Sequence, residues 1–523
     1  MPNVDYDIFV IGGGINGCGI ARDAAGRGYR VALAEMNDLA SATSSASTKL
    51  FHGGLRYLEY FEFRLVKEAL IERENLLHAM PHISWPMRFV LPIAPEMRFD
   101  NSTPTSRLLQ RIMPWMKGRR PAWLIRIGLF LYDHMGGRKV LPATETLDLK
   151  NAAEGVPLRN SFQKAFEYSD CWIEDSRLVV LNAQDARQRG AKILTRTKVV
   201  ATQRLADHWR ITVEEQKSLI RHQITAKMIV NAAGPWVGEL LGQTLGLQTN
   251  EGVRLVRGSH IVTRKLYDHD KAYFFQGTDG RIIFAIPYEG DFTLIGTTDQ
   301  DHLDPNTPVE CSPEEQEYLI NFASQYFEVP IIPKDVVWTF AGVRPLYDDG
   351  ASSASAATRD YVLKVDANST NAPVLNIFGG KITTYRKLAE SALREIEDVL
   401  GAMSPAWTKR APLPGGDFEI NGFDGLVTAL LDEYTFIDPA WAARMVRMYG
   451  TDARNILKNI DNSASVDFGC NVTRAELDWV IKNEFVQRAD DFVWRRSRLG
   501  LRLTQSQIDA IDVYITSQLE DHQ

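Results

Sequence analysis

Residues 7–21 read DIFVIGGGINGCGIA, an apolar strand that runs into a glycine turn and then into a helix. In this pattern Gly12 permits the tight turn, Gly14 lets backbone N–H groups approach a pyrophosphate, and Gly17 lets the helix pack closely on the strand. The phosphates lie at the N-terminus of such a helix, where unpaired N–H groups and the helix dipole favour negative charge. The stretch therefore predicts a dinucleotide-binding unit at the start of the chain.

A second expected strand, residues 30–34, ends at Glu35. An acidic side chain at this position accepts hydrogen bonds from the ribose hydroxyls of a dinucleotide and argues against a 2′-phosphorylated cofactor. Strand, turn, helix, strand and acid follow one another in the order of the fingerprint, so a glycine loop without a ligand is the weaker interpretation. These residues leave open which dinucleotide is bound.

The chain has 523 residues, of which 45% are hydrophobic and 24% charged. This length predicts two or three domains. The four cysteines show neither metal-ligand spacing nor a disulfide pattern, and no charged-then-apolar leader is recognisable, so we expect a reduced, cytoplasmic-side protein without a metal site. No apolar run approaches the ~20 residues that cross a bilayer. The net charge of −7 argues against general nucleic-acid binding and requires local cations for any anionic substrate.

Two later segments are expected to return to the first unit. Residues 228–236 (MIVNAAGPW) are typical of a short buried strand that stops at Gly-Pro. Residues 374–386 (VLNIFGGKITTYR) again run from a strand through glycines into a helix. Two separate glycine-to-helix junctions suit one long cofactor.

The intervening and C-terminal parts of the chain have different patterns. Residues 281–287 and 292–299 flank a turn and predict a hairpin of an antiparallel sheet. Ser312 is expected to cap a helix that begins with proline and carries Glu315 in a capping box. From about residue 401 onward the spacing is helical, with Thr473 as a further cap.

In their order and spacing, the motifs of this chain resemble those of the FAD-dependent glycerol-3-phosphate dehydrogenases, within the glycine-oxidase and D-amino-acid-oxidase group of flavoproteins. The resemblance covers nearly the whole chain and is carried by GGGINGCGIA, SSASTKLFHGGLRYLE, FEYSDCW, NAAGPWV, RGSHIV, IGTTD, GVRPL, TRDY, FGGKITTYRKLAE and LPGG. It implies FAD rather than NAD, and oxidation of glycerol 3-phosphate to dihydroxyacetone phosphate. It also implies that electrons pass to a membrane quinone from a protein docked on the bilayer surface.

The fold that the resemblance implies is α/β. A Rossmann-like FAD-binding domain of the glycine-oxidase and D-amino-acid-oxidase type is expected from residues 1–80, 150–235 and 345–400. Residues 81–149 and 236–344 are expected to form a substrate domain with an antiparallel sheet, and residues 401–523 a helical C-terminal cap. We also expect a homodimer at the cytoplasmic face of the inner membrane.

A phosphate-bearing substrate requires cations with fixed donor geometry, and the planar fork of arginine suits phosphate best. By resemblance, Arg344 in GVRP and Arg359 in TRDY are the expected phosphate clamp. Arg56 and Tyr57 of the GGLRYL motif are expected to line the same pocket. The alternative for any single arginine is a surface charge.

Oxidation of an alcohol moves a hydride from carbon to the flavin while a base takes the hydroxyl proton. Histidine needs the least perturbation to act as that base, and His260 in RGSHIV is our candidate, with His52 as the rival. A hydrogen-bonded structural histidine is the alternative. Arg344 and Lys381 complete the catalytic candidates, because a lysine at a helix N-terminus favours the negative charge of reduced flavin. The other residues expected to contact FAD are Ser47, Thr48, Lys49, Gly234, Gly380 and Thr383.

Residues 107–126 hold six cations and no acid, interleaved with tryptophans and long apolar side chains. Such a mixture suits the headgroup layer of an anionic membrane. A basic loop or an oligomer contact is the alternative, because Pro114 and Pro121 interrupt any long amphipathic helix. Two other functions stay open: a soluble oxidase of the same fold that reduces oxygen to hydrogen peroxide, and a flavin-containing interaction protein without turnover, against which the arginines argue.

Overall fold

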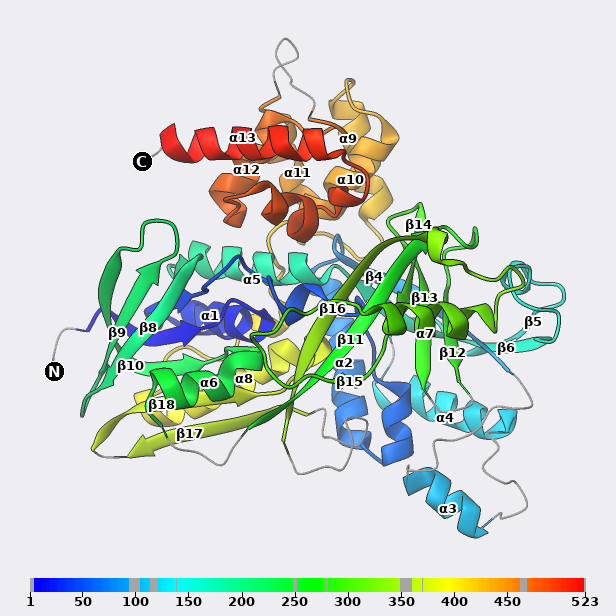
Figure 1. Ribbon diagram of the computed structural model, residues 1–523, viewed down its shortest axis with the longest axis horizontal. Helices are drawn as coiled ribbons and strands as arrows, with labels where there is room; N and C mark the ends of the chain where they lie inside the picture. The colour runs from blue at the N-terminus through cyan, green and yellow to red at the C-terminus, as the bar shows by residue number, and fades with distance from the viewer. Residues whose placement is uncertain are drawn as a thin grey trace.

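The structure is a computed structural model, which describes residues 4–93, 104–112, 121–137, 139–247, 252–277, 281–348, 360–368, 370–460 and 468–521. Two large sheets lie beside each other, and a group of helices formed by the C-terminal part of the chain covers one side of them (Figure 1). The short helices α3 and α4 lie on the opposite side (Figure 1).

The first sheet has the strand order β17-β18-β10-β1-β2-β7, with β8 and β9 attached to β10. Strand β1 pairs in parallel with both β2 and β10, and β10 pairs in parallel with β18. The two predicted returns of the chain to the first unit are therefore confirmed. The strands are β1 Tyr6–Ile11, β2 Val31–Ala34, β7 Lys192–Leu194, β8 Thr197–Arg204, β9 Trp209–Glu215, β10 Arg221–Asn231, β17 Val362–Asn368 and β18 Asn371–Phe378.

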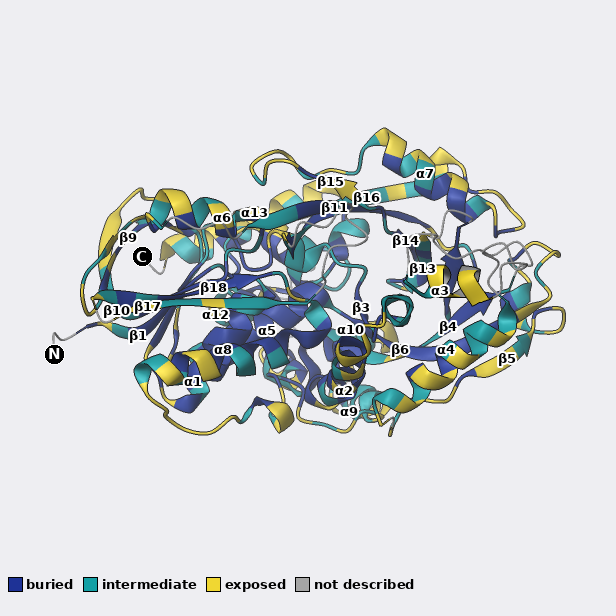
Figure 2. Cartoon of the chain, turned by 90° about the horizontal axis from the view of Figure 1, so that it is seen from below, coloured by how far each residue is buried: buried dark blue, intermediate teal, exposed yellow. Residues whose placement is uncertain are grey.

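Both faces of this sheet are covered, which is why its central strands are continuous apolar runs. Ile8 and Val10 face the helices α1 (Ile15–Arg27), α5 (Asp175–Gln188) and α8 (Tyr385–Leu400). Phe9 and Ile11 alternate to the other face, where they pack with residues of β8, β9 and the short helix α6 (Val237–Glu239). Figure 2 shows the resulting buried layer around α5 and α8.

The second sheet has the order β15-β11-β14-β13-β12-β4-β6-β3, with β16 beside β11 and β5 beside β6. The predicted hairpin is confirmed as the antiparallel pair β13 and β14. The strands are β3 Leu50–Phe51, β4 Ser84–Pro92, β5 Glu145–Asp148, β6 Lys164–Ile173, β11 Val253–Arg264, β12 Ala272–Gln276, β13 Ile282–Tyr288, β14 Phe292–Gly296, β15 Gln300–Asp301 and β16 Val336–Tyr347.

One expected domain boundary differs from the structure. Strand β6 was placed with the first unit, in residues 150–235, but it pairs with β4 along nine residue pairs and so belongs to the second sheet. The pairing partner lies about eighty residues earlier in the chain, and the local pattern of β6 contains no signal that identifies it. The predicted helix after Ser312 is confirmed as α7 (Pro313–Ser324), and its capping box is present.

The C-terminal helices surround a core of their own, as the helical spacing predicted. They are α9 Phe423–Glu433, α10 Pro439–Tyr449, α11 Ala453–Leu457, α12 Arg474–Glu484 and α13 Gln505–Asp521. Thr473 caps α12 by accepting a hydrogen bond from the backbone N–H of Glu476, as expected.

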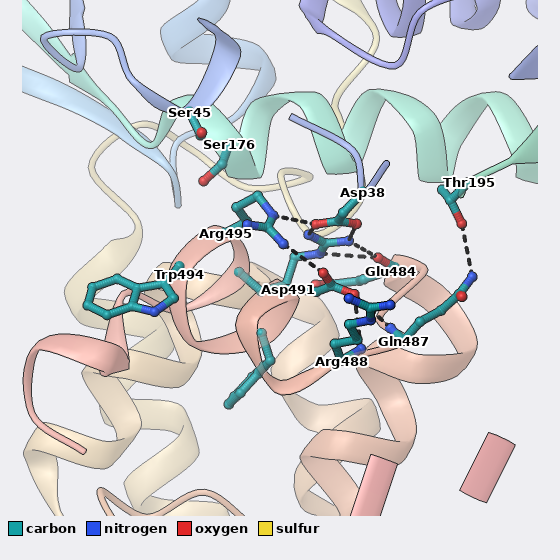
Figure 3. Close-up of polar contacts among 12 residues, drawn as sticks. Asp38, Ser45, Ser176, Thr195, Glu484, Gln487, Arg488, Asp491, Trp494 and Arg495 are labelled. Carbon is teal, nitrogen blue, oxygen red and sulfur yellow. Dashed lines mark hydrogen bonds and ion pairs between the residues drawn. The ribbon is translucent and has the colours of Figure 1, made fainter. Parts of the chain in front are cut away.

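Ion pairs join this C-terminal domain to the first unit (Figure 3). Asp38, in the segment after β2, forms ion pairs with Arg495 at 2.5 Å and with Arg496 at 2.7 Å. Arg196 pairs with Asp491 at 2.7 Å, and Gln487 donates to the hydroxyl of Thr195. The C-terminal domain thus contacts both the segment after β2 and the turn between β7 and β8.

Helices α2 (Phe63–Ala79), α3 (Pro104–Ile112) and α4 (Ala122–Met135) complete the fold. Residues 113–120, which hold Trp115, Arg119 and Arg120 of the predicted basic segment, lie outside the described residues. Within the described ranges, none of the helices has both the length and the apolar character that crossing a membrane requires.

Candidate active site

A cavity of about 500 Å³ lies between the two sheets. Its walls include the glycine turn after β1, Glu35 at the end of β2, and the two later junctions at Gly234 and Gly380. This is the carboxyl edge of parallel strands, where open α/β sheets bind ligands. Of the predicted site residues, the following line the cavity: Gly12, Gly14, Glu35, Ser47, Thr48, Tyr57, Gly234, His260, Arg344, Gly380, Lys381 and Thr383.

The glycine turn is built by close backbone approaches. Gly12 has φ +114°, and a Cβ there would lie 2.4 Å from the carbonyl oxygen of Ala232. A Cβ on Gly17 would lie 2.0 Å from the carbonyl oxygen of Gly12, so Gly17 acts in packing and does not line the cavity. Gly14 precedes α1 and has no side chain to cap it, and the hydroxyl of Ser44 accepts a hydrogen bond from the N–H of Ile15 at 3.1 Å. The N-terminus of α1 lies at the cavity wall, where its dipole favours an anion.

Glu35 is held in place by the backbone. Its carboxylate accepts hydrogen bonds from the N–H of Gly13 at 2.7 Å and of Asn37 at 2.8 Å. Burial raises the pKa of Glu35 above its usual value, and the two backbone hydrogen bonds oppose this rise. The carboxylate thus stands beside the glycine turn, where the fingerprint predicts a ribose contact.

The junction after β18 brings a cation to the cavity. Gly380 has φ +102°, and Asn16 of α1 donates to the carbonyl oxygen of Gly379 at 3.1 Å, which joins the first and last junctions. The ammonium group of Lys381 lies 3.6 Å from the centre of the Tyr57 ring. Both side chains line the cavity, so the GGLRYL and GGKITTYR motifs meet there.

His260 lies on β11, lines the cavity and is only 2% exposed. Its Nε2 is 2.9 Å from the hydroxyl of Thr48, and its ring stacks on Phe340 with centroids 4.7 Å apart. Nδ1 is buried and has no hydrogen-bond partner among the described residues. Burial, with the charges of Arg344 and Lys49 adding to it, lowers the pKa of His260 to about 3. The imidazole is therefore neutral at physiological pH.

Arg344 lies on β16, and its guanidinium faces the same cavity. It pairs with Asp299 and donates to the carbonyl oxygen of Thr298 at 2.7 Å. Sequence reasoning missed Asp299 as the partner that orients this arginine, although the IGTTD motif contains it.

Two glycines, whose role was also missed, make room for these side chains. A Cβ on Gly258 would lie 1.9 Å from Nη2 of Arg344, and a Cβ on Gly296 would lie 2.1 Å from Cδ2 of His260. The RGSH and IGTTD motifs contain both glycines, and a glycine within a strand is a signal of close approach.

Besides Gly17, two predicted residues that the structure describes do not line the cavity. Lys49 is buried and pairs with Asp175 at 2.8 Å. Arg56 lies in the 3₁₀ turn Leu55–Tyr60 and is half-buried, but it does not line the cavity. Arg359 lies outside the described residues. No group of three or more His, Cys, Asp or Glu side chains that could hold a metal ion occurs in the part of the chain that the structure describes.

Comparisons with known proteins agree with this geometry. A family profile described as "FAD dependent oxidoreductase" matches residues 7–386, and one described as "C-terminal domain of alpha-glycerophosphate oxidase" matches residues 406–517. The chain belongs to the FAD-dependent oxidoreductases. The first profile spans both sheets and all three glycine junctions, and the second spans the helical C-terminal domain.

Individual relatives of this oxidoreductase are similar along their whole length. It is 45% identical over 503 residues to the D-erythritol 1-phosphate dehydrogenase of Brucella abortus, covering 96% of each chain. It is also 45% identical over 515 residues to a glycerol-3-phosphate dehydrogenase of Pseudomonas aeruginosa, covering 98% of this chain and 95% of the relative. A glycerol-3-phosphate dehydrogenase from Bacillus halodurans, solved in complex with FAD, superposes with a TM-score of 0.75 at 26% identity, over all of this chain and 91% of that one.

The cavity of this oxidoreductase fits FAD, the cofactor of its family. The close approaches at Gly12 and Gly17 leave the N-terminus of α1 open to a pyrophosphate, and Glu35 stands at the ribose position. Lys381, His260 and Arg344 also line the cavity, and their charges and donors suit a flavin ring and a small anionic substrate. The predicted cofactor and the predicted flavoprotein fold are confirmed.

Proposed function

We propose that this flavoprotein oxidises glycerol 3-phosphate to dihydroxyacetone phosphate and passes the electrons to a membrane quinone. The observation that supports this most is that one cavity is lined by the dinucleotide-binding turns together with Arg344, Lys381 and His260. Two full-length relatives carry names of phosphorylated-polyol dehydrogenases, which points to a substrate with a phosphate and a secondary alcohol.

Arg344 and Lys381 are the proposed cations for the phosphate. The planar guanidinium of Arg344 is oriented by Asp299 and by the carbonyl oxygen of Thr298, so little side-chain entropy is lost when it binds an anion. Lys381 supplies a point charge above the ring of Tyr57. Arg56 and Arg359 stay predictions as further cations of this site.

His260 is the proposed base for the hydroxyl proton. Its neutral ring has a nitrogen lone pair to offer, and a base must be unprotonated before it accepts. Its pKa is lowered partly by the charge of Arg344. A bound phosphate that neutralises Arg344 raises the pKa of His260, because a nearby negative charge favours the imidazolium. We therefore propose that substrate binding itself makes His260 a better base.

FAD, when bound, accepts the hydride that leaves C2 of the substrate. The proton of the C2 hydroxyl goes to His260, and the carbon becomes a ketone. The chain's own task is to hold the alcohol carbon near the flavin, exclude water and keep Lys381 near the charge that develops on reduction.

A second candidate substrate is a longer polyol phosphate. The 45% identity to a protein named D-erythritol 1-phosphate dehydrogenase favours it as strongly as the similar value for the Pseudomonas aeruginosa relative favours glycerol 3-phosphate. Both substrates present a phosphate and a secondary alcohol, so the same cations and the same base serve either one.

An anaerobic titration tests the proposal. Glycerol 3-phosphate and D-erythritol 1-phosphate are added separately to the yellow protein, and we expect the flavin absorbance to bleach with the higher kcat/KM for glycerol 3-phosphate. Reoxidation that is fast with a soluble quinone and slow with air supports the dehydrogenase. Fast reoxidation by air with formation of hydrogen peroxide favours the oxidase, and a flavin that neither substrate bleaches overturns the substrate class.

We further propose that the protein docks on an anionic membrane surface at the cytoplasmic face of the inner membrane through α3 and α4. Trp123 and Phe130 of α4 are 52% and 54% exposed, and Leu108 and Ile112 of α3 are also exposed (Figure 2). Arg107 and Arg111 of α3 add positive charge to this apolar surface. We propose also that the protein acts in a respiratory chain. We propose further that it forms a homodimer, which sedimentation equilibrium would measure.

Vesicle sedimentation tests the docking surface. A variant with Trp123, Ile127 and Phe130 replaced by serine is expected to leave vesicles of phosphatidylglycerol and phosphatidylcholine largely unbound, while the parent pellets with them. A matched control replaces three exposed apolar residues elsewhere, Leu303, Val329 and Val513, by serine and is expected to pellet like the parent. Equal pelleting of both variants would exclude α4 as the contact.

A further inference from the structure

Helix α4 has a buried face as well as an exposed one. On the face opposite Trp123 and Phe130, Leu129 is completely buried and Tyr132 is 1% exposed. Tyr132 packs among residues of the second sheet and of α2, where its ring stands edge-on to Tyr168. A polar group in such surroundings is costly unless it is hydrogen-bonded, so the contacts of this phenol are informative.

The hydroxyl of Tyr132 joins three segments that are distant in the chain. It accepts a hydrogen bond from the backbone N–H of Gly53 at 2.7 Å. It donates to the carboxylate of Asp170 on β6, with oxygen distances of 2.8 and 2.9 Å. Asp170 in turn pairs with Arg73 of α2, and Arg73 donates to the carbonyl oxygen of Ser169 at 2.7 Å. All of these groups are buried, so the network is not screened by solvent.

Gly53 belongs to the segment that carries two cavity residues, His52 and Tyr57. A Cβ on Gly53 would lie 2.5 Å from Leu70 and 2.8 Å from the Tyr132 ring, so the backbone rests directly on these side chains. The next turn is tight: Tyr57 N–H donates to the carbonyl oxygen of Gly54 at 2.8 Å. The Gly53 amide is therefore anchored one residue before the turn that carries Tyr57.

The ring of Tyr57 in turn contacts the ammonium group of Lys381 at 3.6 Å. A cation over an aromatic face is attracted to it, and the attraction depends on the geometry of the pair. A short series of contacts thus leads from the phenol of Tyr132 through Gly53 and Tyr57 to a cation of the active-site cavity.

We propose that Tyr132 is a positioning residue for the oxidation reaction: through its hydrogen bond to Gly53 it fixes the placement of Tyr57 and Lys381 in the cavity. Tyr132 itself does not line the cavity. The role of Lys381 toward the substrate rests on the proposed function, but its place at the cavity wall does not.

The test removes one oxygen atom. In Tyr132→Phe the Gly53 N–H loses the phenol oxygen and keeps only the Asp170 carboxylate, with which it also interacts. The Gly53 amide is then expected to shift toward Asp170 and KM for glycerol 3-phosphate to rise about tenfold, since small displacements of positioning groups have large kinetic effects. We also expect a shift in the visible flavin spectrum and in its midpoint potential, because the charge of Lys381 moves relative to the ring. These two readings need no substrate, so they test the proposal even if the protein oxidises neither polyol phosphate.

The matched control is Tyr326→Phe. The hydroxyl of Tyr326 is an equivalent buried junction: it accepts from the N–H of Gln276 at 3.1 Å and donates to the carbonyl oxygen of the same residue at 2.6 Å, away from the cavity. We expect both variants to lower the melting temperature to a similar extent, and only Tyr132→Phe to change KM, spectrum and potential. Equal kinetics and spectra in the two variants overturn the proposal.

Hydrogen exchange tests the same contact in the unmodified holoenzyme, whether or not the variant folds. The Gly53 amide is expected to be protected like the amides of the central strands, because its acceptor is a buried phenol. Exchange of Gly53 as fast as that of an exposed loop amide would overturn the proposal.

Discussion

Glycines decide the orientation of the two side chains that face the proposed substrate. Arg344 passes over Gly258, and His260 lies against Gly296, in each case closer than any Cβ allows. Both glycines lie in strands, where glycine is otherwise unfavourable for stability. At the scale of single residues, the placement of Arg344 and His260 thus depends on the absence of a Cβ at Gly258 and Gly296.

Replacing Gly258 by alanine is expected to displace the Arg344 guanidinium. We expect KM for glycerol 3-phosphate to rise about 10- to 100-fold, with a smaller effect on kcat, because the loss falls on phosphate binding. Gly252, just before the same strand, has open space at its Cβ position, so Gly252→Ala is the control and should keep the parent KM. Flavin reduction at varied substrate concentration measures both constants.

His260→Asn is expected to slow flavin reduction by about 10²–10⁴-fold, the usual contribution of a general base. In the parent, kcat/KM should show no loss from protonation of His260 between pH 8 and pH 5, because its pKa in the free protein is about 3. An unchanged reduction rate in His260→Asn across this range would assign the proton to another group. Stopped-flow absorbance at 450 nm is the measurement, about where oxidised flavins absorb.

At the scale of elements, the segment Ser45–Lys49 is held between the cavity and the C-terminal domain. Asp175, at the start of α5, accepts from the backbone N–H and hydroxyl of Ser47 and pairs with the ammonium of Lys49. Arg498 of the C-terminal domain reaches the same carboxylate at 3.1 Å. Thr48 lies between Ser47 and Lys49 in the sequence, and its hydroxyl is hydrogen-bonded to Nε2 of His260 at 2.9 Å. The C-terminal domain therefore supports the loop that contacts the candidate base.

Removing the charge of Arg498 leaves Asp175 with a single buried cation. We expect Arg498→Met to cost about 3 kcal/mol of stability, in the range for breaking a buried ion pair, and to weaken FAD binding. Arg502→Met is the control, because its pair with Asp291 at 2.8 Å is partly exposed to solvent and is expected to contribute less than about 1 kcal/mol. Urea denaturation and FAD retention during gel filtration distinguish the two. Equal losses in both variants would argue against this support.

At the scale of the whole molecule, the contact between the C-terminal domain and the sheets buries charges that titrate. His82, just before β4, is completely buried beneath Phe418, and neither ring nitrogen has a hydrogen-bond partner among the described residues. Burial, with the charges of Arg177 and Arg447, lowers its pKa to about 3. His260 behaves in the same way at the cavity. Between about pH 3 and pH 6.5, His82 and His260 are therefore neutral in the folded protein but protonated in the unfolded chain.

The free energy of unfolding is therefore expected to decrease as the pH is lowered below about 6.5. The unfolded chain protonates these histidines near pH 6.5, whereas the folded protein does so only near pH 3. Between these values the loss approaches about 1.4 kcal/mol per pH unit for each histidine. His82→Phe should remove one such contribution and make the slope shallower. Urea denaturation between pH 7 and pH 4.5 measures the slopes.

Local patterns in the sequence determined much of this molecule. The strand-glycine-helix stretch at residues 7–21, the hairpin of β13 and β14, and the caps at Ser312 and Thr473 all formed as predicted, because each depends on hydrogen bonds and packing among residues close in the chain. A dinucleotide site could be inferred for the same reason, since the fingerprint residues follow one another within a single βαβ unit, whereas FAD was implied by the family resemblance of motifs along the whole chain.

Only the tertiary structure decided the rest. It placed β6 in the second sheet, directed Lys49 to Asp175, lowered the pKa of His260 and brought the phenol of Tyr132 to Gly53. Each of these depends on a partner more than seventy residues away, or on the loss of solvent that comes only when the sheets meet. Local sequence patterns do not encode burial or long-range pairing. The types of side chain at the site could therefore be predicted, but the protonation state of His260 and the contacts of Lys49 and Gly53 could not.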